Sequence, residues 1–133
     1  MSANTQPIFP LTPTIGIATL TTPTAITTRT NIVGTTGLTP LTPPSTNGKR
    51  VDSIRIRCKA TSVATNLCVW LYNGTTSHLI DEISIGVTTA SNTSAAYVSE
   101  TLYDNMVLPA TYQLFVSVTV AQDMNVFCHG GDY

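Results

Sequence analysis

The chain has 133 residues, a formal net charge of −1, 42% hydrophobic residues and only 10% charged residues. This length is typical of one domain, and the high hydrophobicity with low net charge excludes an intrinsically disordered chain. The sequence has no run of about 18 apolar residues, so it predicts no transmembrane helix and no membrane partner.

The few charged side chains are unevenly distributed along the chain. All six basic residues lie before residue 60, and six of the seven acidic residues lie after residue 80. Nucleic-acid binding requires a net basic face, which a near-neutral chain does not provide, so we expect no nucleic-acid partner. The N-terminal MSANTQPIFP has neither the basic start nor the apolar run of a secretory signal. We therefore expect synthesis in a cytoplasm, where the three cysteines stay reduced.

The first fourteen residues have the pattern of an extended arm. Pro7, Pro10 and Pro13 recur every third residue, which is the period of a polyproline II helix. Such a helix has no internal hydrogen bonds, so it becomes ordered only against another surface. Residues 1–14 are therefore either a frayed terminus or an arm that docks on a neighbouring subunit. The anchors of a docking arm would be its apolar residues, Ile8, Phe9 and Leu11.

Residues 15–133 predict a single all-β domain. Segments rich in Val, Ile, Thr and aromatic residues alternate with turn signals such as Asn47-Gly48 and Asn73-Gly74. Only residues 100–108 could hold a helical turn. About eight short strands predict a jelly-roll-like antiparallel β-sandwich. The expected strands are 14–20, 29–34, 50–61, 67–72, 77–85, 96–102, 112–120 and 124–129.

Side-chain alternation in SIRIRCKA predicts which strand face is buried. Ile54, Ile56 and Cys58 share one side of the strand, which we assign to the core. The opposite side carries three basic residues: Arg55, Arg57 and Lys59. We expect these basic side chains to meet an acidic surface of a partner or of a neighbouring copy.

Both faces of the strand LCVWLY are apolar. If Leu67 and Val69 face the core, Trp70 and Tyr72 face away from it. Two interpretations stay open. The aromatic pair is an exposed contact surface, or the protein's own loops cover the strand on both sides.

The C-terminal FCHGGDY brings a thiol, an imidazole and a carboxylate within five positions. Successive side chains of a strand point to opposite faces, so Cys128 and His129 cannot form a nucleophile–base pair. A zinc site needs three or four ligands, and the sequence has no paired motif such as CxxC or HxxxH. It also has no glycine-rich phosphate loop and no GxSxG. We therefore expect no enzyme activity, no catalytic residue, no metal and no cofactor, and interpret FCHGGDY as the end of the last strand.

Three groups of motifs carry a resemblance to a known family. They are PIF followed by IG; NGKRVDSIRIRCKAT followed by LCVWLYNGTT and LIDEISI; and MVLPATYQLFVSV ending in MNVFCHGGDY. With this combination the chain resembles small β-rich virion structural proteins of tailed bacteriophages, whose chains end in HGGDY or HGGDF. The resemblance covers most of the chain. The Thr- and Pro-rich stretch 21–44 and the cysteines Cys58 and Cys68 depart from the family's usual pattern.

The resemblance implies a jelly-roll-like capsid decoration or cement protein, usually a homotrimer. Its partners would be the major capsid protein and further copies of itself, and it would lie on the outer capsid surface of the virion. HGGDY would be a structural terminus with a double-glycine turn and a capping acid. Trp70 and Tyr72 would contact the capsid or a subunit. The alternative is a tail- or head-fibre domain that binds host-surface glycans by stacking these two aromatics on sugar rings.

Overall fold

The computed structural model describes residues 12–30, 32, 34 and 36–133, and these residues form an all-β structure. Within them there is no helix long and apolar enough to cross a membrane. The strands are β1 (Thr12–Leu20), β2 (Thr39–Pro40), β3 (Lys49–Cys58), β4 (Thr65–Tyr72), β5 (Ser77–Ile85), β6 (Val98–Leu108), β7 (Gln113–Val118) and β8 (Met124–Asp132).

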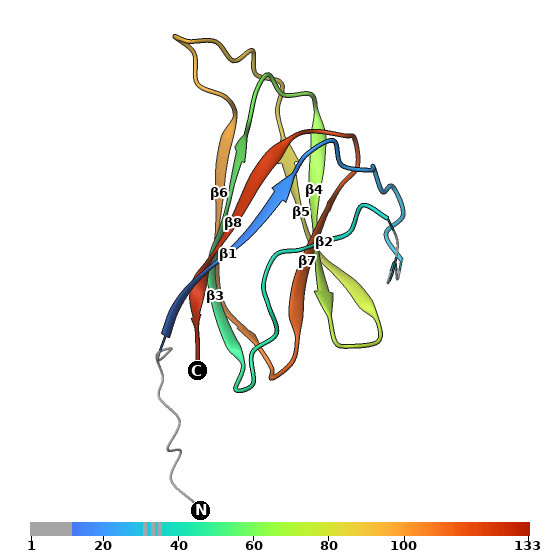
Figure 1. The fold of residues 1–133 in the computed structure, drawn as a ribbon, viewed down its shortest axis with the longest axis vertical. Helices are drawn as coiled ribbons and strands as arrows, with labels where there is room; N and C mark the ends of the chain where they lie inside the picture. The colour runs from blue at the N-terminus through green and yellow to red at the C-terminus, as the bar shows by residue number, and fades with distance from the viewer. Residues whose placement is uncertain (1–11, 31, 33, 35) are drawn as a thin grey trace, which may run out of the picture.

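Two four-stranded antiparallel sheets pack face to face as a sandwich (Figure 1). The terminal sheet, which contains the first and last strands, has the order β1-β8-β3-β6, and the opposite sheet has the order β2-β7-β4-β5. The pairs β4–β5, β3–β6, β2–β7 and β1–β8 lie alternately in the two sheets, as in one long hairpin rolled around the core. This is the topology of a jelly roll, so the predicted fold class is confirmed.

The main core lies between the sheets and is built by alternation. Ile54, Ile56 and Cys58 of β3 are buried, as the pattern SIRIRCKA predicted. The facing side chains come from the opposite sheet, and those fully enclosed there are Leu67, Val69, Leu114, Val116 and Val118. Full burial of each such side chain contributes roughly 1.5–3 kcal/mol. This continuous apolar layer holds both sheets rigid.

A second apolar cluster covers the other face of the opposite sheet. Cys68 and Trp70 pack there against Ile26 and Ile32, which belong to the long segment between β1 and β2. The backbone amide of Ile26 donates a hydrogen bond to the carbonyl of Val118 at 2.8 Å, which ties this segment to the sheet. Ile26 and Ile32 of this segment are therefore packed on the sheet and shield β4 from solvent.

The strand boundaries differ from expectation in three places. Residues 29–34 form no strand where they are described. The sheet is instead extended by the two-residue β2, beyond which Pro43 and Pro44 supply no amide donors. Residues 100–108, where a helical turn was considered, lie in the strand β6 and pair with β3. β1 begins at Thr12, so residues 12–14 of the predicted arm are in the terminal sheet.

The segment FCHGGDY is confirmed as the end of the last strand. β8 runs through both glycines to Asp132 and pairs with β1 on one side and β3 on the other, so the expected double-glycine turn is wrong. Gly130 lies opposite Val51, where β3 bulges, and a Cβ at this position would collide with the carbonyl oxygen of Arg50. Glycine is needed there because two backbones approach closely.

Candidate binding surface

The reactive side chains of the chain are dispersed or buried. The described residues contain no group of three or more His, Cys, Asp or Glu side chains that could hold a metal ion. Cys58, Cys68 and Cys128 are free and buried. Burial raises the pKa of each thiol, that of Cys128 to about 11, so the thiols are protonated at neutral pH.

The outer face of the terminal sheet carries several exposed apolar side chains. We call it the terminal face. Residues paired across the sheet share a face, so Ile17, Phe127, Arg55 and Glu100 form one row and Ile15, His129 and Leu102 lie in the next. Five of its hydrophobic side chains are strongly exposed: Ile15 (60%), Ile17 (58%), Val98 (44%), Leu102 (76%) and Val107 (53%). These side chains lie on the two edge strands, β1 and β6, with Phe127 and the polar and charged side chains of β8 and β3 between them.

Two of the predicted basic residues lie on this face. Arg55 and Arg57 point outward from β3 and are exposed. Within the described residues neither side chain has an ion pair, although Glu100 lies directly opposite Arg55 in the strand register. Lys59 lies just beyond β3, where its Nζ donates a hydrogen bond to Thr21 Oγ1 at 2.7 Å. The structure therefore brings Arg55 and Arg57 together on the terminal face, whereas Lys59 binds the protein's own chain.

Trp70 is not available to a partner. Its side chain is 0% exposed, and its Nε1 donates a hydrogen bond to Ser117 Oγ at 2.9 Å. The expectation of an exposed Trp70 contact is wrong, and cover by the protein's own loop is confirmed, because Ile26 and Ile32 occupy the space above the indole. The predicted arm anchors Ile8, Phe9 and Leu11 lie outside the described residues.

The side chain of Tyr72 is half-buried, so a ligand can still contact it. Its ring packs edge-to-face on Phe115 with 5.5 Å between centroids, and its hydroxyl donates to the Gly74 carbonyl at 2.8 Å. Both rings line a pocket of about 290 Å³ with Leu38. This pocket lies on the opposite sheet, away from the terminal face. Tyr72 therefore does not form an exposed aromatic pair with Trp70.

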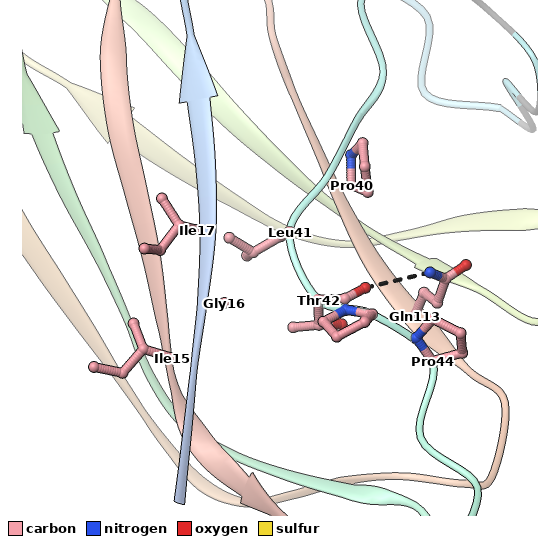
Figure 2. Close-up of a pocket in the computed structure, with 9 residues that line it drawn as sticks. Ile15, Gly16, Ile17, Pro40, Leu41, Thr42, Pro44 and Gln113 are labelled. Atoms are coloured by element: carbon pink, nitrogen blue, oxygen red, sulfur yellow. Dashed lines mark hydrogen bonds between the residues drawn. The ribbon is translucent and has the colours of Figure 1, made fainter.

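A groove runs along the free edge of β1, and we call it the edge groove (Figure 2). Its volume is about 420 Å³; it is lined by Ile15, Gly16 and Ile17 on one side and by residues 40–44 and Gln113 on the other. A Cβ at Gly16 would collide with the carbonyl oxygen of Leu41, so glycine lets the two segments meet at the groove floor. The second wall is fixed by a hydrogen bond from Gln113 Nε2 to the Thr42 carbonyl at 3.3 Å.

A buried ion pair holds the three neighbouring strands of the terminal face in register. Lys49 of β3 is 3% exposed, and its Nζ lies 2.5 Å from Asp132 Oδ1 on β8. The same ammonium donates to Thr14 Oγ1 of β1 at 3.4 Å. One cation thus links β1, β8 and β3 at the end of the sheet.

Sequence patterns did not reveal the apolar part of the terminal face. In TIGIATL the large residues Ile15 and Ile17 face solvent, whereas the small residues Gly16 and Ala18 face inward. The sequence does offer one signal, the large apolar Leu20 on the same side of the strand as Gly16. If Leu20 is assigned to the core, alternation places Ile15 and Ile17 on the outer face. The strand pattern predicts only that Leu102 ends a strand.

Comparisons with known proteins give no match to this chain among family models, curated proteins or solved structures.

Proposed function

We propose that this protein is a structural component of a tailed-bacteriophage virion that decorates or cements the outer capsid surface. Its terminal face would bind the major capsid protein. The observation that supports this best is the exposed apolar face that carries Arg55 and Arg57 without ion-pair partners among the described residues. The resemblance of the sequence to small virion proteins agrees with this assignment.

The chemistry of the face defines the surface that it fits. Ile17 and Leu102 lose water on docking, at about 25 cal/mol for each Å² of apolar area removed from solvent. A guanidinium that leaves water without a counterion costs free energy, so the partner must present carboxylates to Arg55 and Arg57. Arginine is enriched at protein interfaces relative to the rest of the protein surface. The expected partner is therefore a flat apolar protein surface with two acidic groups.

The mechanism is mechanical. The terminal face is rigid because its strands are paired on a fully packed core, so little conformational entropy is lost on docking. A standard interface buries about 1,600 Å², and many copies on one shell add their individually modest binding energies. Each copy would bridge neighbouring capsid subunits and resist their separation. No step requires a reacting group.

The test is binding of the purified protein to capsids that have been stripped of it. Wild-type protein should bind and raise the temperature at which the shells break. Leu102→Glu and the double variant Arg55→Glu/Arg57→Glu should bind at least tenfold more weakly. Val87→Glu is the matched control, since Val87 is 71% exposed outside the terminal face. Full binding by the terminal-face variants would refute the proposal.

A second candidate is a fibre domain that binds host-surface glycans. It is favoured by one observation, the pocket lined by Tyr72 and Phe115, because aromatic rings stack on sugars. Labelled protein would then bind intact host cells and ignore stripped capsids. Tyr72→Ala would abolish cell binding, whereas Leu102→Glu would not affect it.

A further inference from the structure

The edge groove has an unused strand edge on one side. β1 pairs with β8 alone, and among the described residues no backbone hydrogen bond joins Ile15, Gly16 or Ile17 to the facing segment. That segment contains Pro40, Pro43 and Pro44, which have no amide hydrogen to donate. The edge of β1 therefore presents free backbone groups to the groove, as edge strands do.

The groove selects an uncharged, extended apolar segment. None of its lining residues is charged; prolines line one wall, and the side chains of Ile15 and Ile17 lie on the outer side of β1, pointing away from that wall (Figure 2). An extended peptide gains backbone hydrogen bonds from a free strand edge and places alternate side chains in apolar pockets. Residues 1–11, MSANTQPIFPL, have this chemistry, because they contain no charged side chain and carry Ile8, Phe9 and Leu11 between prolines. They lie outside the described residues and directly precede β1.

A chain cannot place these anchors in its own groove. Thr12, the first residue of β1, pairs with Asp132 of β8, so Leu11 is the last residue before the strand. If the chain reversed direction directly before β1, the turn would use at least two residues. Phe9 would then lie opposite Thr12, and Ile8 would lie opposite Pro13. Ile17 lies four residues beyond Pro13. Extended away from its own sheet, the segment of eleven residues reaches roughly 36 Å, enough to meet another copy.

We infer that the edge groove receives residues 7–11 of a second copy of this chain. Each copy donates one segment and accepts another, which is a head-to-tail contact that closes into a ring when the rotation between copies allows it. Side chains of an extended segment alternate, so Phe9 and Leu11 bury apolar area against Ile15 and Ile17, whereas Ile8 faces the opposite wall. This inference does not rest on the proposed function, because self-association is measured without capsids.

The first experiment measures the mass of the protein in solution by sedimentation. Full-length wild type should form an oligomer of the 14.1 kDa chain, and deletion of residues 1–11 should weaken association at least tenfold. Ile17→Glu, which places a charge in the groove, should have the same effect. Leu102→Glu is the matched control because it introduces the same charge on the same face away from the groove, and it should leave association intact. Circular dichroism confirms that each variant is folded.

The second experiment mixes two defective chains. The chain without residues 1–11 keeps its groove, and the full-length Ile17→Glu chain keeps its arm. Each alone should be monomeric, whereas the mixture should form a one-to-one heterodimer. A monomeric wild type, association that survives the deletion, or a mixture that stays monomeric would overturn the inference. Equal weakening by Ile17→Glu and Leu102→Glu would also overturn it, since the interface would then be the terminal face.

Discussion

Lys49 of β3 and Asp132 of β8 form an ion pair that is unequally exposed: the lysine side chain is 3% exposed and the aspartate side chain 35%. The buried partner is therefore the cation, and it depends on Asp132 for its counterion. A charge left alone in such a place costs several kcal/mol, less where solvent reaches it in part. Asp132 thus supplies the counterion of a buried cation at the end of the terminal sheet.

Asp132→Asn should lower the free energy of unfolding by about 2–3 kcal/mol, because it leaves Lys49 buried without a counterion. Lys49→Met should cost less, since an apolar side chain needs no counterion. Asp52→Asn is the control, as its partner Arg50 is one-third exposed, and it should change stability by less than about 0.5 kcal/mol. Urea unfolding measures all three. Equal losses for Asp132→Asn and Asp52→Asn would contradict the assigned role.

Stability should fall at alkaline pH through Cys128. Burial raises the pKa of this thiol from 9.0 to about 11, so the folded state holds the proton more tightly than the unfolded state. The contribution of this thiol to the free energy of unfolding is fully present below pH 9 and is lost as the pH rises through 11. The total loss is about 2.7 kcal/mol, because the two pKa values differ by two units.

The measurement is the urea midpoint between pH 8 and pH 11.5 for the native thiol and for Cys128→Ala. Burial also raises the pKa of Tyr103, so both proteins should carry Tyr103→Phe to remove an overlapping titration. The alanine variant should show the flatter pH dependence. Parallel curves would mean that the thiol ionises equally easily in both states.

Trp70 is the only tryptophan, so its fluorescence reports on the cover over β4. We expect blue-shifted emission that acrylamide quenches poorly, because the indole is fully buried. Ile26→Ala should increase quenching and lower stability by about 2 kcal/mol through the cavity that it leaves. Val87→Ala, at an exposed position, should change neither quantity. An unchanged quenching constant in Ile26→Ala would show that the 21–38 segment does not protect the ring.

Gly130→Ala should destabilise the protein by about 3 kcal/mol or more, because the new methyl group meets the Arg50 carbonyl on a paired strand that cannot move away. Gly86→Ala is the matched control, since its methyl group would only touch the Tyr97 ring at 3.5 Å. We expect a change below about 1 kcal/mol there. Thermal midpoints of the two variants distinguish these outcomes. Similar midpoints would mean that β3 and β8 yield locally.

Local alternation predicted much of this fold but not all of it. The buried side of β3 followed from SIRIRCKA because charges and aliphatics alternate there without ambiguity. Trp70 could not be placed, because its cover comes from Ile26 and Ile32, some forty residues earlier in a segment with no regular pattern. β2 was missed because its pairing depends on Phe115 and Val116 across the sheet, and prolines lie in and near it.

The candidate surface was only half predictable for a similar reason. Arg55 and Arg57 are outward on any assignment of β3, so their exposure followed from the sequence. Ile15 and Ile17 look like core residues; the inner side of β1 is shown by the burial of Ala18 and Leu20 and by the close approach of Gly16 to Leu41. Contacts between distant segments decide such cases, and a single strand does not encode them.

The position of β8 between β1 and β3 has a consequence for biosynthesis. β8 follows β1 and β3 in the chain, so β1 cannot join the terminal sheet until β8 has been synthesised. Nascent chains emerging from the exit tunnel hold β1, β3 and β6 without the strand that joins β1 to β3. Closure of the terminal sheet is therefore a late step and, with pairings between residues as far apart as Thr12 and Asp132, a slow one. Prematurely terminated chains should be cleared by cellular proteases.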